Sequence, residues 1–246
     1  TPDATSLANW ATNVNQAVED NDNGLVTTNS YLGVFYPSGL TSDNFGNNIV
    51  VPASHMMLRT IALSDQVSFP WFAPAGTRRG GITNASSTGY INAEGEFVST
   101  ALNEGQRDTL YTNKVNPITF ITGAGLVNYG QKTRFAGTSS LDRINVSRLV
   151  IYLRSQLNKL ARPFVFEPND KITRDEIKAQ AESLLLELVG NRAIFDFLVV
   201  CDESNNTPTR IDRNELYLDI AIEPVKAVEF IYIPLRLKNT GEIAGL

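Results

Sequence analysis

The sequence predicts a mixed α/β and α+β fold in two parts, and three observations lead to this prediction. Residues 31–122 alternate short apolar runs with turns and helical patterns, residues 141–188 carry apolar side chains at helical spacing, and residues 194–223 change to the alternation of strands. A short run of small and polar residues separates the two parts. We therefore expect an α/β domain over 1–138 and an α+β domain over 139–246, in which two helices pack on a small sheet.

The first domain begins with a predicted helix over residues 3–18, where apolar residues recur on one face. The acidic pentad that follows, at 20–24, is similar to the start of a calcium loop. The twelfth position of such a loop would be Ser30, where a bidentate glutamate is required. The run of Asn, Asp and Gly therefore favours a solvated turn. Because the chain starts at Thr1, we expect this domain to be incomplete at its N-terminus.

Short elements follow. We expect strands at 31–36, 49–51 and 115–122, helices at 53–63 and 97–110, and a packed aromatic loop at 69–81. The last of these strands leads into Gly123-Ala124-Gly125, which is similar to the start of a dinucleotide-binding fingerprint. Asn128 stands where the third glycine belongs, and Gly130 comes two residues late. A glycine turn between strands is the favoured interpretation.

The first helix of the second domain is marked by apolar residues at steps of three and four, which include Leu149 and Leu153. Ser140 or Asp142 can cap its start. Pro163 ends it, because proline disfavours the α conformation at the residue before it.

The second helix is marked by Thr173 and Glu176, which fit a capping box. Gly190 is placed to close this helix with a left-handed residue.

Three strands are predicted after the helices, at 194–201, 216–223 and 227–237. The last contains Pro234, which cannot donate a ladder hydrogen bond, so this strand is expected at a sheet edge. A long apolar strand with an edge to offer can pair with another molecule.

Composition and charge disfavour several classes of partner. The net charge is -5 and the isoelectric point is near 5.0, which disfavours binding to nucleic acid or to an acidic membrane through overall charge. The sequence has no run of about eighteen apolar residues and no signal-like segment, so we expect no membrane span. The single cysteine, Cys201, excludes an intrachain disulfide.

A hydrolase is suggested only by Ser54 and His55, with Asp65 near in sequence. Adjacent side chains on a helix or strand point apart, and a nucleophile needs its base within hydrogen-bond reach. His55 is the only histidine in the chain. We therefore expect no catalytic site, no metal site and no cofactor. A degenerate serine hydrolase is the less favoured alternative.

Several segments, in order along residues 31–237, carry a resemblance to a known family. They read VVPASHMMLRTIALSDQVSFPWFAPAGTRRGGI, NYGQKTR, INVSRLVIYL, FVFEPND, VVCDESNNTP and AVEFIYIPL. Together they resemble the contractile tail sheath proteins of tailed bacteriophages. The resemblance implies a subtilisin-like first domain without the Asp/His/Ser machinery of a protease, followed by a sheath C-terminal domain.

The same resemblance implies a structural role. Sheath subunits of this kind form hexameric rings that stack helically around a tail tube protein and contract to drive the tube through the host envelope. The further expected partners are baseplate and tail terminator proteins. The expected location is the virion, after assembly in the host cytoplasm. A pyocin-like or secretion-type contractile injection system is the alternative.

Three sets of residues are candidate contacts. The terminal strand is expected to pair between subunits through Glu229, Phe230, Ile231, Tyr232, Ile233, Pro234, Leu235, Arg236 and Leu237. A basic face of the first C-terminal helix is a candidate tube contact, or a solvated surface, formed by Arg148, Arg154, Lys159 and Arg162. Carboxylates of this or a neighbouring subunit, or a phosphate, are expected to meet Arg78 and Arg79.

Overall fold

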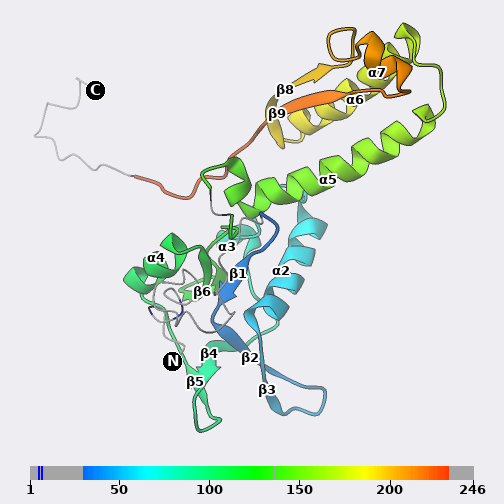
Figure 1. The fold of residues 1–246 in the computed structure, drawn as a ribbon. Helices are drawn as coiled ribbons and strands as arrows, with labels where there is room; N and C mark the ends of the chain where they lie inside the picture. Colours follow the sequence, from blue (N-terminus) through cyan, green and yellow to red (C-terminus); the bar gives the residue numbers. More distant parts are fainter. Residues whose placement is uncertain (1–4, 6, 8–29, 136, 233–246) are drawn as a thin grey trace, which may run out of the picture.

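The computed structural model describes residues 5, 7, 30–135 and 137–232. Figure 1 shows two parts that meet near the start of the long helix α5 (Ile144–Ala161). The expected helix at 3–18, apart from residues 5 and 7, and the acidic turn at 20–24 lie outside the described residues.

Two small sheets form the first part. In one, strand β6 lies between a parallel and an antiparallel neighbour: β1 (Val34–Tyr36), β6 (Val115–Ile121) and β7 (Gly125–Asn128). The other is antiparallel, in the order β3 (Asn48–Val51), β2 (Ser38–Ser42), β4 (Ser87–Ile91) and β5 (Phe97–Ser99). The strands expected near 31–36, 49–51 and 115–122 are thus confirmed, the first only in its second half.

The helices of the first part are α2 (Ala53–Val67), α3 (Gly76–Arg79) and α4 (Glu104–Thr112). The helix expected at 97–110 is confirmed only from residue 104 on, in α4, because residues 97–99 form β5 and pair with β4. The start of α4 is set by a capping box. The Asn103 side chain accepts from the backbone N–H of Gln106 at 2.9 Å, and the Gln106 side chain accepts from that of Asn103 at 3.0 Å.

A hairpin turn joins β6 to β7. Gly123 and Gly125 have φ values of 86° and 79°, which lie in the left-handed region that glycine adopts without strain. The glycine turn predicted here is confirmed, and the similarity to a dinucleotide fingerprint has no helix behind it.

The second part consists of helices packed on one two-stranded sheet. In chain order its elements are η1 (Ser140–Asp142), α5, η2 (Arg162–Phe164), α6 (Lys171–Gly190), β8 (Ile194–Val200), α7 (Pro208–Asp212) and β9 (Asp219–Pro224). Strands β8 and β9 pair antiparallel, with an irregularity between Ile194 and Asp196.

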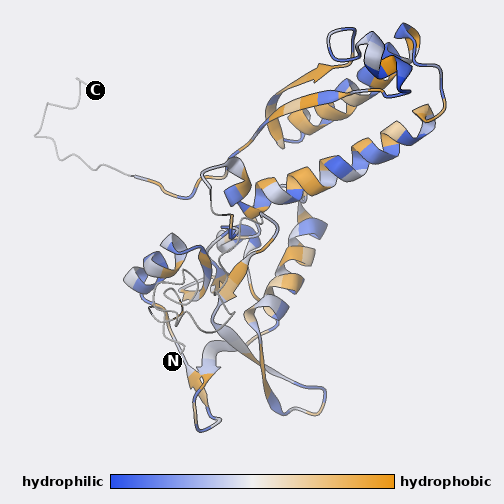
Figure 2. Ribbon diagram, in the orientation of Figure 1, coloured by the Kyte–Doolittle hydropathy of each residue, from blue (hydrophilic) through white to orange (hydrophobic). Residues whose placement is uncertain are grey.

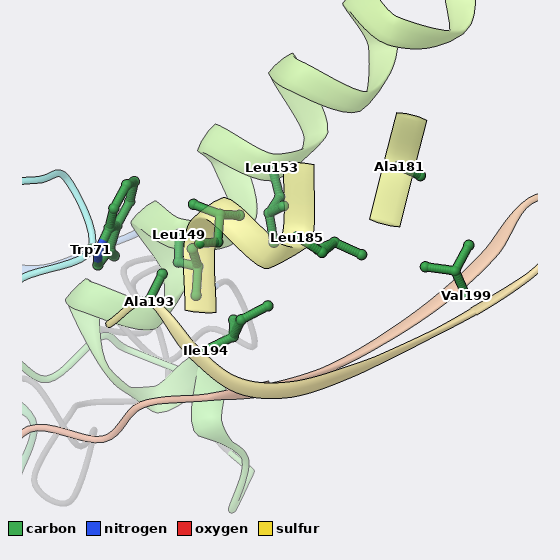
Figure 3. Packing of buried hydrophobic residues seen from close by; sticks show 9 residues of the cluster. Trp71, Leu149, Leu153, Ala181, Leu185, Ala193, Ile194 and Val199 are labelled. Carbon is green, nitrogen blue, oxygen red and sulfur yellow. The ribbon is translucent and has the colours of Figure 1, made fainter. Parts of the chain in front are cut away.

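The core of the second part lies between α5, α6 and the sheet. Figure 2 shows hydrophobic and hydrophilic residues intermixed along both helices, as amphipathic helices require. Figure 3 shows the buried set, which comprises Trp71, Leu149, Leu153, Ala181, Leu185, Leu188, Ala193, Ile194 and Val199. One member, Trp71, comes from the first part. The loop expected to pack at 69–81 therefore enters the core of the second part.

Three expectations about the ends of the helices are wrong. Helix α6 begins at Lys171, because the Asp170 carboxylate accepts from the N–H of Thr173 at 2.9 Å and caps the helix ahead of the proposed box. Arg143 occupies the N-cap position of α5 and makes no side-chain capping bond. Gly190 is still helical, and the left-handed residue is Arg192, with a φ of 61°.

The last two strands also differ from expectation. Strand β9 starts at Asp219, because the Asn206 side chain binds the N–H and the C=O of Tyr217, at 2.7 and 2.9 Å. These bonds take the place of a strand partner. Residues 227–232 of the expected third strand are not in a strand.

Candidate intersubunit site

The chain leaves β9 without turning back along it (Figure 1). Its last backbone hydrogen bond to the sheet joins the N–H of Val225 to the C=O of Ala193, at 3.1 Å. We call residues 227–232 the arm; within the described part they make no backbone hydrogen bond. Their large apolar side chains are mostly exposed: 78% for Val228, 66% for Phe230, 77% for Ile231 and 88% for Tyr232. The arm is an apolar segment that the described residues of its own chain leave largely exposed.

One arm residue, Glu229, is held in place. Its side chain is only 15% exposed. Arg143 donates to both carboxylate oxygens, from Nε to Oε1 at 2.5 Å and from Nη2 to Oε2 at 2.9 Å. Gln131 Nε2 donates to Oε1 at 3.1 Å, and the Tyr111 hydroxyl also bonds to this carboxylate. We call Tyr111, Gln131 and Arg143 the Glu229 socket. Bidentate arginine–carboxylate pairs are among the strong hydrogen bonds of proteins.

The socket favours the ionised form of Glu229. Burial would raise the pKa of this carboxyl, but the hydrogen bonds from Arg143, Tyr111 and Gln131 outweigh burial and hold the pKa below its usual range. Burial and the nearby Glu229 charge raise the pKa of Tyr111, so its hydroxyl stays a donor at neutral pH. Burial would lower the pKa of Arg143, yet its bonds to Glu229 raise it.

Buried polar contacts fix the segment that carries Gln131. Asn116 on β6 is fully buried, and its amide donates to the C=O of Val34 at 2.9 Å and of Lys132 at 2.8 Å. Its carbonyl accepts from the N–H of Lys132 at 2.6 Å. The N–H of Ile144 donates to the C=O of Gln131 at 2.7 Å, which joins this segment to the start of α5. The socket is therefore built from segments of both parts that hydrogen bonds tie together.

The sheet beside the arm is incomplete. Strands β8 and β9 each have one partner, so among the described residues each presents one free edge. Ile220 and Ile222 of β9 pack against the core, and Leu198 of β8 is 61% exposed. A two-stranded sheet is marginal by itself, and a free edge offers unpaired N–H and C=O groups to another strand.

The structure places the predicted contact residues unequally. Glu229, Phe230, Ile231 and Tyr232 lie in the arm, whereas 233–237 lie outside the described residues. On α5, Arg148 is bound to Asp65 of α2 at 2.5 Å, so it is not a free surface cation. The other three predicted cations are exposed and have no ion-pair partner among the described residues: Arg154 and Lys159 of α5, and Arg162, which begins η2 directly after it.

Arg78 and Arg79 form the last turn of α3. Arg78 is exposed, and the described residues provide neither arginine with a carboxylate partner. Arg79 donates from Nε to the C=O of Ala73 at 3.3 Å and lies 4.7 Å from the centre of the Phe72 ring. Burial, with the charges of Arg78 and Arg192, lowers the pKa of Arg79. The expected carboxylate partner is thus not found within the described part of this chain.

Ser54 and His55 lie exposed on the first turn of α2, and no hydrogen bond joins their side chains. No group of three or more His, Cys, Asp or Glu side chains in the described part could hold a metal ion. Among the helices that the structure describes, none is both long and apolar enough to cross a bilayer.

The socket is the part of the site that sequence reasoning missed. Glu229 was predicted as an arm residue, but Tyr111, Gln131 and Arg143 were not linked to it. These three residues lie in separate segments and follow no periodic pattern. The available signal was the polar Gln131 next to a glycine, within the NYGQKTR segment that already stood out.

Comparison with known proteins gives one consistent picture. The model of the phage tail sheath C-terminal domain matches residues 137–238. The tail sheath protein of Vibrio phage KVP40 is 35% identical over 252 residues, which covers 98% of this chain and 36% of that protein. The tail sheath protein of Enterobacteria phage T4 is 31% identical over 249 residues, which covers 98% of this chain and 35% of that protein.

Solved structures show the same fold. A chain of the anti-feeding prophage helical sheath in its contracted state has a TM-score of 0.74 at 19% identity, with 97% of this chain and 68% of that chain covered. A chain of the PVC extracellular contractile injection system sheath, also contracted, has a TM-score of 0.70 at 20% identity, with 86% and 57% covered. The present chain spans roughly a third of the length of the curated relatives it matches, 36% and 35%.

Proposed function

This chain is related over 98% of its length to phage tail sheath proteins and carries their C-terminal domain at residues 137–238, and on that basis we propose that it is a structural subunit of a contractile tail sheath. Copies of the chain polymerise around a tail tube and shorten to drive that tube through the host envelope. The rings are hexameric and stack helically. The sheath is part of the virion and is assembled in the host cytoplasm.

The observation that carries this proposal is the arm. It leaves the subunit with four exposed apolar side chains and no backbone partner, next to a sheet with two free edges. An apolar segment that extends away from its own subunit, and a sheet that lacks strands, are complementary halves of one contact. The arm of one copy adds a strand to the β8–β9 sheet of the next, through residues 229–237.

Strand addition suits a sheath that must stay connected while it changes shape. A row of main-chain hydrogen bonds is lost only if many bonds break together, so the link survives the rearrangement of the subunits. The rest of the subunit then moves between two packing states that differ in free energy. Contraction runs downhill once it is triggered and needs no bound nucleotide.

The remaining partners follow from the same role. The exposed cations Arg154 and Lys159 of α5, with Arg162 just after its end, are candidates for contact with the tail tube protein. Baseplate and tail terminator proteins bind the ends of the sheath. Arg78, which is exposed on α3, is a candidate for an ion pair with a carboxylate of a neighbouring subunit.

The part of the chain before residue 139 is the counterpart of the subtilisin-like sheath domain, and it acts as scaffold and not as a hydrolase. Hydrolysis of an activated ester that Ser54→Ala or His55→Ala abolished would support the alternative of a degenerate serine hydrolase.

A sheath of a pyocin-like or secretion-type injection system is the second candidate function. The fold similarity to sheath chains of such systems favours it. The phage sheath is preferred because the sequence identities to phage tail sheath proteins are higher, 35% and 31% against 19% and 20%.

Negative-stain electron microscopy of the protein, beside the same protein cut after Lys226, tests the proposal. We expect hollow, ridged tubes from the intact protein and small particles from the truncated one. Normal tubes from the truncated protein would rule out the arm as the connection. Small particles from both proteins, even with purified tail tubes added as template, would contradict the sheath function.

A further inference from the structure

The local sequence around the arm favours a contact that the structure does not contain. Strand β9 ends at Pro224, and the alternating apolar residues resume at 227 after a short break. Two apolar runs joined by a connection this short are typical of a β-hairpin. Such a hairpin would place the arm on the free edge of its own β9. The arm instead continues away from β9 and pairs with no strand among the residues that the structure describes (Figure 1).

We infer that the Glu229 socket prevents the arm from folding back onto its own sheet and so reserves that sheet edge for the arm of a second copy. The inference rests on the proposed strand exchange and adds a residue that decides between exchange and self-closure. Exchange and self-closure use similar contacts, so a small local preference decides which forms, as in domain swapping.

The position of Glu229 is incompatible with the hairpin. In a hairpin, a residue so soon after the turn would lie beside β9. Glu229 lies instead against Tyr111 and Gln131, which belong to the first part of the chain. Before it, the N–H of Val225 remains bonded to Ala193, at 3.1 Å, so the chain keeps its course past the end of β9.

Among the arm residues that the structure describes, Glu229 is the one whose side chain is anchored to the rest of the subunit. Its side chain is 15% exposed, whereas the large apolar side chains of the arm are between 66% and 88% exposed. Ala227, Glu229 and Phe230 border an open cavity of about 630 Å³, so packing does not replace the socket bonds.

Hydrogen–deuterium exchange of the dilute, unassembled protein tests the inference. In the natural protein we expect residues 227–232 to exchange at the rate of unprotected chain. In Glu229→Gln we expect the arm and residues 219–223 to exchange at least threefold more slowly, because the released arm pairs with β9. The double variant Arg143→Glu with Glu229→Arg swaps the two charges and so restores an ion pair. It should restore fast exchange of the arm.

Glu223→Gln is the matched control, since Glu223 is an exposed carboxylate of β9 outside the socket. Unchanged exchange of the arm in Glu229→Gln, or equal protection in Glu223→Gln, would overturn the inference. Slow exchange of α5 and α6 in the same spectra reports that the fold is intact. If Glu229→Gln unfolds, Arg143→Gln provides the same test, because it also removes the ion pair. Because no assembly is needed, failure of the sheath proposal would leave this result standing.

Discussion

The indole Nε1 of Trp71 donates a hydrogen bond to the backbone carbonyl of Asn191 at 3.1 Å, across the boundary between the two parts of the chain. The Trp71 ring is 6% exposed, stacks on Phe69 at 4.7 Å and meets Tyr152 edge-on at 5.3 Å. A loop of the first part thus supplies a central side chain to the core of the second. The two parts share a core, and this loop fixes how they sit together.

Trp71→Ala should destabilise the protein by about 3–5 kcal/mol, because it removes a buried aromatic ring and leaves a cavity. Trp71→Phe should cost less, about 1–3 kcal/mol, because it keeps most of the ring but leaves the Asn191 carbonyl without its donor. Urea denaturation followed by circular dichroism measures both. Val67→Ala, at a position 75% exposed on α2, is the control and should change stability by less than about 0.5 kcal/mol. A Trp71→Ala effect as small as the control would contradict the shared core.

The Glu229 contact should weaken in acid. The folded-state pKa of Glu229 lies below its unfolded value of about 4.3, so the contact contributes fully above that pH and is lost as the pH falls through the folded-state pKa. Glu229→Gln should therefore cost about 1.5–3 kcal/mol at neutral pH, as for hydrogen bonds to charged groups, and progressively less as the pH falls through the folded-state pKa. Denaturation of both proteins across this range measures the difference. A difference that stayed constant with pH would show that the charge of Glu229 is not what holds this residue in the socket.

Asn116 should be among the most sensitive polar positions of the first part. Asn116→Ala removes a buried side chain with three hydrogen bonds to backbone groups of Val34 and Lys132, and should cost about 2–4 kcal/mol. Chemical denaturation tests this, with Asn158→Ala on the exposed surface of α5 as the control. Equal effects of the two substitutions would mean that Asn116 does not organise this segment.

Periodic patterns in the sequence were sufficient to predict most elements. The apolar spacing that includes Leu149 and Leu153 predicts α5, and both residues are buried in the core. The ends of the helices were harder, because several residues compete to cap them. Asp170 precedes Thr173 and satisfies its N–H, so the capping box that fits the sequence is not the cap that forms. Such choices depend on short-range geometry that spacing does not record.

The contacts of the candidate site could not be predicted from periodic patterns in the sequence. The sequence predicts an apolar terminal strand, but not that Glu229 would be held by Arg143, which precedes it by 86 positions. It also predicts a basic face on α5, although Arg148 is occupied by Asp65, at 83 positions' separation. Long-range ion pairs leave no periodic signal, and only the fold brings their members together.

Charge reversal of the exposed cations in the second half of α5 and directly after it should impair contact with the tail tube without lowering the stability of the subunit. Reversal of Arg154, Lys159 and Arg162 to Glu should change the free energy of unfolding by less than about 0.5 kcal/mol per site, because these side chains are exposed. It should prevent assembly on purified tail tubes, measured by cosedimentation. Arg148→Glu is the contrasting variant, since it places a carboxylate against Asp65 and should lower stability. Unimpaired assembly of the triple variant would show that this face is a solvated surface.

A single lysine on the inward face of the added arm strand should abolish assembly without affecting the folded subunit. Phe230 and Ile231 are 66% and 77% exposed, so a lysine at either position should alter stability by less than about 0.5 kcal/mol. In an added strand, successive side chains point to opposite faces, so one of the two must face the helices that cover the sheet. The lysine at that position should block tube formation in electron micrographs, and the other should be milder. Leu58→Lys on α2, at a position 69% exposed, controls for added charge, and normal tubes from both arm variants would exclude the arm from the intersubunit sheet.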